Sequence, residues 1–254
     1  MFKAFSAIIG VPMQGMRRLI CLLPFFLAAC STAPPAPTPR GEPPVAPMTS
    51  GEFGQSDANR MATLGMRDNL ASLSLLADKL YRRNPAEWRK SQATREAALA
   101  QLKTAIDTNM PWPELQGKRD IAALSLALGP DFKGDRVAAF IAASADMLVT
   151  AHGNKSTFYL TDPLDAQYIY NAARNIEIAV WLLASRKNAR GLPLLLADEI
   201  NDQERNLSFE REFGKIIGRL DLLSAMLTEK YRRAVITYVQ GLLGGTFLQF
   251  LPVR

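Results

Sequence analysis

The chain has 254 residues, with 30 Lys and Arg against 24 Asp and Glu, and a formal net charge of +6 at pH 7. The basic residues are dispersed among acidic ones and form no clustered basic stripe, so we expect no nucleic-acid partner. One histidine and two cysteines are too few for most metal sites and most catalytic triads, and we expect neither a metal nor a cofactor.

The amino-terminal region carries a secretory pattern. The basic pair Arg17-Arg18 precedes an apolar run at residues 19–26, and Leu27-Ala28-Ala29 stands directly before Cys30. Positive charge, a short apolar run and small residues in this order are typical of a signal peptide. The run is shorter than the roughly 20 residues that span a bilayer, which favours a cleaved signal over a transmembrane helix.

The four residues from Leu27 to Cys30 resemble the lipobox of bacterial lipoproteins, Leu-[Ala/Ser]-[Gly/Ala]-Cys. The resemblance implies that residues 1–29 are removed, that the thiol of Cys30 receives diacylglycerol and that the new amine is acylated. Two or three acyl chains anchor stably, because each buried methylene contributes roughly 0.8 kcal/mol. Ser31, in place of an aspartate, implies by the same resemblance the periplasmic face of the outer membrane rather than the inner membrane.

Processing of this kind would change the chemistry of the chain. Loss of residues 1–29 removes three basic residues and no acidic one, which lowers the net charge from +6 to +3. Cys21 would leave with the signal and Cys30 would carry lipid, so the folded domain would have no thiol for a disulfide, a nucleophile or a zinc site. Catalysis would then depend on carboxylates, Lys, Tyr or Ser.

Residues 30–55 form the expected linker. Proline is frequent from Ser31 to Pro47, and such tracts adopt extended polyproline II structure with about 3.1 Å per residue. We expect this spacer to separate the following domain from the membrane. The same composition leaves open a second interpretation, a ligand for a proline-recognising module.

Residues 56–254 are expected to form one all-α domain, a bundle of about five to seven helices. Apolar residues recur at spacings of three and four, and no run shows sustained alternation. Asn84-Pro85 and Asp162-Pro163 each predict a cap followed by a first helical residue. The expected helices span about 61–84, 85–106, 118–128, 137–151, 163–190 and 208–233, followed by an uncharged tail at 234–253.

Asp146 is the only ionisable residue from Val137 to Ala151. The helix expected over this range is otherwise apolar or small on every side, and such a helix belongs in the middle of a bundle. The carboxylate of Asp146 must be paired, protonated or beside water. An ion pair with Arg174 is the structural interpretation, and a raised pKa in a pocket would instead make Asp146 a general acid or base. Glu177 poses the same question, with Arg174 one turn earlier as its partner.

His152 falls at the end of the same helix, beside Gly153, where the helix dipole favours a cation. We expect a capping role, since no G-x-S-x-G motif accompanies it. His152, Asp146, Arg174 and Glu177 are therefore the candidate buried polar residues. An acidic cluster further along lacks the spacing of a calcium loop, which favours a solvated turn. Its members are Asp198, Glu199, Asp202 and Glu204.

The tail at 234–253 has no charged residue between Arg233 and Arg254. Its length approaches a membrane span, but Gln240 and Gly244-Gly245 weaken a continuous helix. Packing in the core, docking on a partner or membrane surface, and a membrane span all remain open. The residues expected to make such a contact are Tyr238, Leu242, Leu243, Phe247 and Phe250.

These features favour a non-enzymatic lipoprotein at the periplasmic face of the outer membrane that assists the assembly or stability of an envelope complex. The expected partners are the membrane, through lipid on Cys30, and an envelope protein. One alternative is a carboxylate-dependent hydrolase of cell-wall glycan, which needs two acids facing a cleft about 5 to 9 Å apart. Another is a lipid-binding module, suggested by the apolar tail and the apolar central helix.

Overall fold

The computed structural model of the chain describes residues 49–200 and 205–248. The chain divides into two units, residues 1–53 and 54–254. In the first unit the described residues begin a 3-10 helix, η1 (Ser50–Gly54), in which the backbone N–H and the hydroxyl of Thr49 both donate to Oε1 of Glu52. The expected signal peptide, Cys30 and the proline-rich tract lie outside the described residues.

The second unit is all-α, as the periodicity predicted, and its described residues form seven α-helices. They are α2 (Asp57–Arg83), α3 (Pro85–Trp88), α4 (Arg95–Asp107), α5 (Asp120–Ala127), α6 (Arg136–Ala151), α7 (Ala166–Ser185) and α8 (Ser208–Leu248). A 3-10 turn, η2 (Pro113–Leu115), precedes α5. Two short antiparallel strands, β1 (Glu199–Ile200) and β2 (Arg205–Asn206), precede α8, with Glu199 opposite Asn206.

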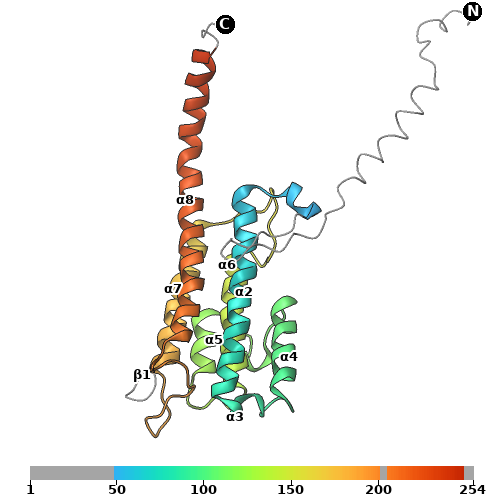
Figure 1. Cartoon of the computed structure of the whole chain (residues 1–254), viewed down its shortest axis with the longest axis vertical. Helices are drawn as coiled ribbons and strands as arrows, with labels where there is room; N and C mark the ends of the chain where they lie inside the picture. Colours follow the sequence, from blue (N-terminus) through green and yellow to red (C-terminus); the bar gives the residue numbers. More distant parts are fainter. Residues whose placement is uncertain (1–48, 201–204, 249–254) are drawn as a thin grey trace, which may run out of the picture. The chain divides into compact units, whose positions relative to one another are not determined.

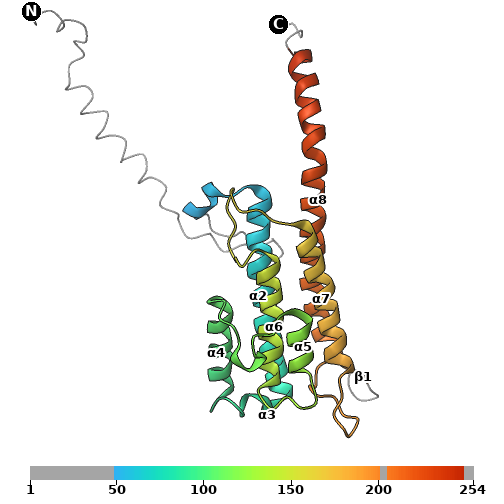
Figure 2. The same cartoon turned by 180° about the vertical axis from the view of Figure 1, so that it is seen from behind.

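Helix α6 lies in the middle of the bundle, in contact with α2, α4, α5 and α7 (Figures 1 and 2). Most of its side chains are buried, including Phe140, whose ring meets Phe213 of α8 edge to face with the ring centroids 6.2 Å apart. Asp135 caps its first turn by accepting the N–H of Ala138 at 3.0 Å. The prediction of a central helix over 137–151 is therefore confirmed.

The predicted helix over 85–106 is wrong in one respect, because it is divided into α3 and α4. Helix α3 is a single turn, and Thr94 begins α4 by accepting the N–H of Ala97 at 3.1 Å. Asn84 does not cap α3 with its side chain. Its amide instead donates to the carbonyls of Leu80 and Leu196 and accepts from the N–H of Leu196. These hydrogen bonds join the end of α2 to the segment before β1.

Helix α7 begins later than Asp162-Pro163 predicted. Asp165 is its cap and accepts the backbone N–H of Gln167 at 2.7 Å and of Tyr168 at 3.3 Å. Asp162 lies in the preceding turn, where its carboxylate accepts the N–H of Tyr159 and pairs with Lys155. Both carboxylates serve local hydrogen bonds, but only the one adjacent to the helical residues can cap them.

Helices α7 and α8 lie side by side and antiparallel, and the carboxyl-terminal part of α8 continues past the amino-terminal end of α7 (Figures 1 and 2). The hydroxyl of Ser224 donates to the carbonyl of Ala166, at the start of α7, and the carboxylate of Asp221 binds Arg174 further along α7. The carboxyl-terminal part of α8 has no neighbouring helix at its side in either view. Within residues 49–200 and 205–248, no helix has the length and apolar character needed to cross a membrane.

Candidate functional site

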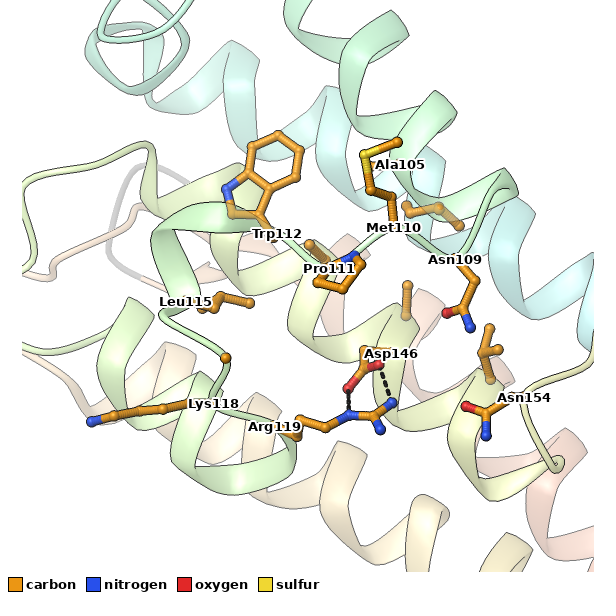
Figure 3. Close-up of a pocket in the computed structure, with 15 residues that line it drawn as sticks. Ala105, Asn109, Met110, Pro111, Trp112, Leu115, Lys118, Arg119, Asp146 and Asn154 are labelled. Carbon is orange, nitrogen blue, oxygen red and sulfur yellow. Dashed lines mark hydrogen bonds and ion pairs between the residues drawn. The ribbon is translucent and has the colours of Figure 1, made fainter.

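A pocket of about 310 Å³ opens beside Asp146, between α4, η2 and α6 (Figure 3). Five of its lining side chains belong to the hydrophobic core and form an apolar floor. These are Ile106, Trp112, Leu115, Ala145 and Val149. The exposed Met110 and the neighbouring Pro111 extend the apolar surface to the rim. The pocket therefore offers space for a compact apolar group.

Asp146 forms an ion pair with Arg119 at the edge of this pocket. Nε of Arg119 donates to Oδ2 at 3.0 Å, and Nη2 donates to Oδ1 at 2.6 Å and to the hydroxyl of Thr150 at 2.6 Å. The side chains of Arg119 and Asp146 are 51% and 30% exposed, so the pair lies near the surface and the expected burial of Asp146 is wrong. The expected partner, Arg174, is also wrong, because Arg174 faces α8.

The chemistry open to Asp146 follows from this pairing. Both carboxylate oxygens of Asp146 accept hydrogen bonds from the guanidinium of Arg119. The hydrogen bond to Asp146 raises the pKa of Arg119 above its ordinary value. Asp146 is the only acidic residue in the described lining of the pocket. A glycosidase needs a second acid across the cleft, and these residues do not supply one. Within the described ranges, no three potential ligands converge to hold a metal ion.

Arg174 and Glu177 lie in a separate cluster between α7 and α8. Nη2 of Arg174 donates to both carboxylate oxygens of Asp221, at 2.8 and 2.7 Å, and Nη1 lies 2.9 Å from Oε1 of Glu177. The predicted pair of Arg174 with Glu177 is thus confirmed. Their expected burial is wrong, since Arg174 is half-buried and Glu177 is exposed on the solvent side of α7. The cluster joins two helices, and none of its three residues lines the Asp146 pocket.

His152 is buried, with 2% of its surface exposed, and it is the C-cap residue of α6. Nδ1 lies 2.7 Å from the carbonyl oxygen of Leu148, which can only accept, so Nδ1 carries the proton. Nε2 has no hydrogen-bond partner among the described residues. Burial lowers the pKa of His152, so the position at the helix end is confirmed but the expected cation is wrong. The imidazole is neutral at pH 7 and packs against Phe158.

Left-handed backbone conformations gather around the Asp146 pocket. Four non-glycine residues have positive φ in the described chain, and two of them, Asn109 (φ 51°) and Asn154 (φ 60°), line the pocket. The other two, Gln116 (φ 54°) and Asp120 (φ 51°), flank the lining segment 117–119. Such conformations cost about 1–3 kcal/mol each and concentrate at binding and catalytic sites. The loops that form the pocket therefore contain left-handed turns, and the two in the lining are at asparagines, which tolerate that conformation better than most residues.

A buried polar network that the sequence reading missed lies at the start of α6. The carboxylate of Asp135 accepts the hydroxyl of Tyr81 at 2.8 Å, and Glu87 accepts the N–H of Arg136 at 2.8 Å and Nζ of Lys90 at 2.7 Å. Burial raises the pKa of both Tyr81 and Asp135. The position of Asp135 two residues before the apolar run that begins at Val137 was an available cap signal. This network holds the start of α6 against α2 and α3.

The acidic cluster before α8 contains a cap in place of a purely solvated turn. Asp198 accepts the N–H of Phe209 at 3.1 Å and of Glu210 at 3.0 Å, in the first turn of α8. Glu199 pairs with Arg83 at the end of α2. Asp202 and Glu204 lie outside the described residues.

The carboxyl-terminal part of α8 is exposed. We call residues 234–248 the terminal segment of α8; it contains no charged residue. Ile236, Tyr238 and Val239 are 38%, 69% and 46% exposed, and Leu242 is also exposed, so the described part of the tail is not packed in the core. Phe250 and the side chains of Leu243 and Phe247 lie outside the described residues.

Tyrosine side chains surround the place where this segment leaves the bundle. Tyr168, Tyr170 and Tyr231 line an open groove of about 900 Å³ between α7, α8 and the end of α6, and all three are exposed. The hydroxyl of Tyr231 donates to the carbonyl of Leu164 at 3.2 Å, which fixes its ring beside the groove. Tyr238 lies about two turns further along α8. Tyr231 and Tyr238 therefore lie on the same helix, on either side of the exposed charged pair Arg232-Arg233.

Comparisons of the chain with protein-family models, with curated proteins and with solved structures find no match.

Proposed function

We propose that the protein is a non-enzymatic lipoprotein of the bacterial outer membrane, held at the periplasmic face through lipid on Cys30. The helical bundle assists the assembly or stability of an envelope complex, and the terminal segment of α8 gives the bundle a second attachment by entering the surface of the bilayer. The observation that carries the proposal is an uncharged segment whose described apolar side chains are exposed. An uncharged stretch of exposed apolar side chains of this kind marks a contact site for a protein or a membrane.

The arrangement of the exposed side chains favours lipid as the covering phase. Successive residues of a helix are about 100° apart, so Ile236 and Tyr238 point in directions that differ by about 160°. A groove on a partner protein covers one side of a helix, whereas lipid covers several sides at once.

The charged and aromatic residues next to the segment also favour contact with a membrane surface. Lys230, Arg232 and Arg233 immediately precede it, and Arg232 also binds Glu229 on the same helix. Basic residues near an anionic surface contribute about 1 kcal/mol each. Tyrosine is enriched where a protein crosses from water to lipid. Tyr231 lies just before the terminal segment of α8, and Tyr238 lies within it.

Photo-crosslinking in living cells tests the attachment directly. The full chain carries a photo-reactive amino acid in place of Val239, in the terminal segment. A matched control carries it in place of Leu222, which is 59% exposed on α8 but lies before the segment. We expect phospholipid adducts from position 239 and none above background from position 222. Equal labelling at both positions, or protein adducts alone at position 239, contradicts the bilayer contact.

Two further measurements separate the parts of the proposal. Mass spectrometry of the amino-terminal peptide from purified membranes should show a chain that begins at Cys30 and carries acyl chains, and an unmodified Cys30 contradicts the anchor. Native electrophoresis in mild detergent should show the chain in a complex with one envelope protein at fixed stoichiometry. Migration as a lone monomer contradicts the scaffold role and leaves the result of the crosslinking intact.

A further inference from the structure

We propose that the pocket beside Asp146 is a binding site for a small monocarboxylate with a compact apolar body. This site is independent of the membrane attachments proposed above. Its volume of about 310 Å³ is at the lower end of the range for ligand pockets, roughly 300–1,000 Å³. The size therefore excludes a large ligand and fits a molecule with one ring or a short chain.

The residues that form the floor of the pocket determine where the apolar part of the ligand binds. Trp112 and Leu115 come from the segment around η2, Ile106 from α4, and Ala145 and Val149 from α6. Figure 3 shows Trp112 and Leu115 on one side of the space and Asp146 on another. A ligand that fills the space must therefore place its apolar part against these walls and its polar part near Asp146.

The polar edge supplies donors. Nε and Nη2 of Arg119 are occupied by Asp146 and Thr150, while Nη1 makes no hydrogen bond within the described chain. The side-chain amides of Asn109 and Asn154 also make none there, and Figure 3 shows both on the same side of the pocket as the ion pair. A carboxylate has two oxygens and accepts several such donors at once.

Charge favours an anion over a cation. The described lining as a whole contains Lys118 and Arg119 against one acid, Asp146, a balance of +1, although the Arg119–Asp146 pair is itself neutral. Figure 3 shows Lys118 turned away from the ion pair, so Arg119 is the cation nearest to the polar edge. A ligand cation would meet a carboxylate that is already engaged at both oxygens. An anion instead meets a guanidinium with an unused N–H pair.

The backbone holds the donors in place before a ligand arrives. Asn109 and Asn154 both adopt left-handed φ values, which asparagine tolerates better than most residues. Each lies at the end of a helix, after α4 and after α6. Their side-chain amides are therefore carried by turns that are attached to the bundle. Less backbone ordering is then needed when a ligand binds.

Calorimetric titration tests the assignment with three probes that share one body: 3-phenylpropanoate, 3-phenylpropanamide and 3-phenylpropylamine. The full chain is used in phosphatidylcholine nanodiscs, with empty nanodiscs as the blank. We expect saturable binding with the carboxylate about tenfold tighter than the amide, because charge-assisted hydrogen bonds exceed neutral ones. The amine should not bind measurably. No saturable binding of the carboxylate, or equal affinity for amide and carboxylate, overturns the proposal.

Two variants locate the site. Ala142→Leu adds volume to a half-buried position in the lining, and it should weaken carboxylate binding more than tenfold. The control, Ala184→Leu, adds the same volume at an exposed position on α7 and should bind as the wild type does. Thermal melts of both variants establish that they are folded. Unchanged binding by a folded Ala142→Leu chain overturns the location.

A third variant separates ligand binding from a purely structural ion pair. Asp146→Asn removes the counter-ion of Arg119 and raises the charge balance of the lining to +2. Carboxylate affinity should then increase about two- to fivefold, the range expected when an exposed ion pair no longer competes. A lower or unchanged affinity in a folded Asp146→Asn chain contradicts the role of Arg119 as the anion-binding group.

Discussion

The hydroxyl of Tyr81 on α2 donates a 2.8 Å hydrogen bond to the carboxylate of Asp135, and neither residue is exposed to solvent. Asp135 is at the same time the cap of α6, through the N–H of Ala138. One carboxylate therefore joins the end of α2 to the start of the central helix. Because both groups are buried, the Tyr81 hydroxyl depends on Asp135 for its hydrogen bond, while Asp135 also accepts from Ala138 and Ser91.

Replacement of Tyr81 with Phe should lower the free energy of unfolding by about 1.5–3 kcal/mol, the range for a hydrogen bond to a charged group that is left buried. Asp135 would keep its cap but lose the phenol, and the pKa of Asp135, already raised by burial, should rise further. Urea denaturation measures the change. The control Tyr168→Phe removes a hydroxyl from a 63% exposed ring and should stay within about 0.5 kcal/mol. Equal effects would contradict the importance of the buried pair.

Replacement of Asp146 with Asn should change the free energy of unfolding by less than about 1 kcal/mol. The ion pair with Arg119 is partly exposed, and such pairs contribute little because water and salt screen them. The same denaturation assay measures this. A loss as large as that expected for Tyr81→Phe would show that the ion pair is a principal support of the fold rather than part of a pocket edge.

Replacement of Phe140 with Ala should lower the free energy of unfolding by about 3–5 kcal/mol, because it removes a buried ring and leaves a cavity in α6. The edge-to-face contact with Phe213 is lost as well. Leu192→Ala, at a 57% exposed position, is the comparison and should change the free energy by about 0.5 kcal/mol or less. A small effect of Phe140→Ala would mean that the bundle closes over the vacated space.

Stability should fall as the pH falls below about 6.5, and His152 should account for part of the fall. Burial lowers the pKa of His152 below its ordinary value of 6.5. Between 6.5 and the folded pKa the unfolded chain binds more protons than the folded chain, so acid favours unfolding there. Urea midpoints at pH 7.5 and 5.5 should differ more for the wild type than for His152→Gln. The variant retains every other titrating group, including Asp135, so equal differences would assign the fall to those groups.

Several local features were predictable from neighbouring residues. The helix that became α6 was predicted because one ionisable residue stands in an otherwise apolar run, and the start of α8 at Ser208 was predicted from the return of helical spacing. The division of 85–106 and the start of α7 were missed. In both cases a polar residue closer to the helix, Thr94 or Asp165, was the better cap.

The sequence by itself determined the all-α class, the central position of α6 and the pairing of Arg174 with Glu177, because each depends on residues within a few turns of one another. Only the tertiary structure decided that Asp146 binds Arg119, that Tyr81 meets Asp135 across 54 positions, and that the terminal segment of α8 is exposed. Helical spacing shows which side of a helix is apolar. What covers that side, and which charge lies opposite, depends on how distant helices pack.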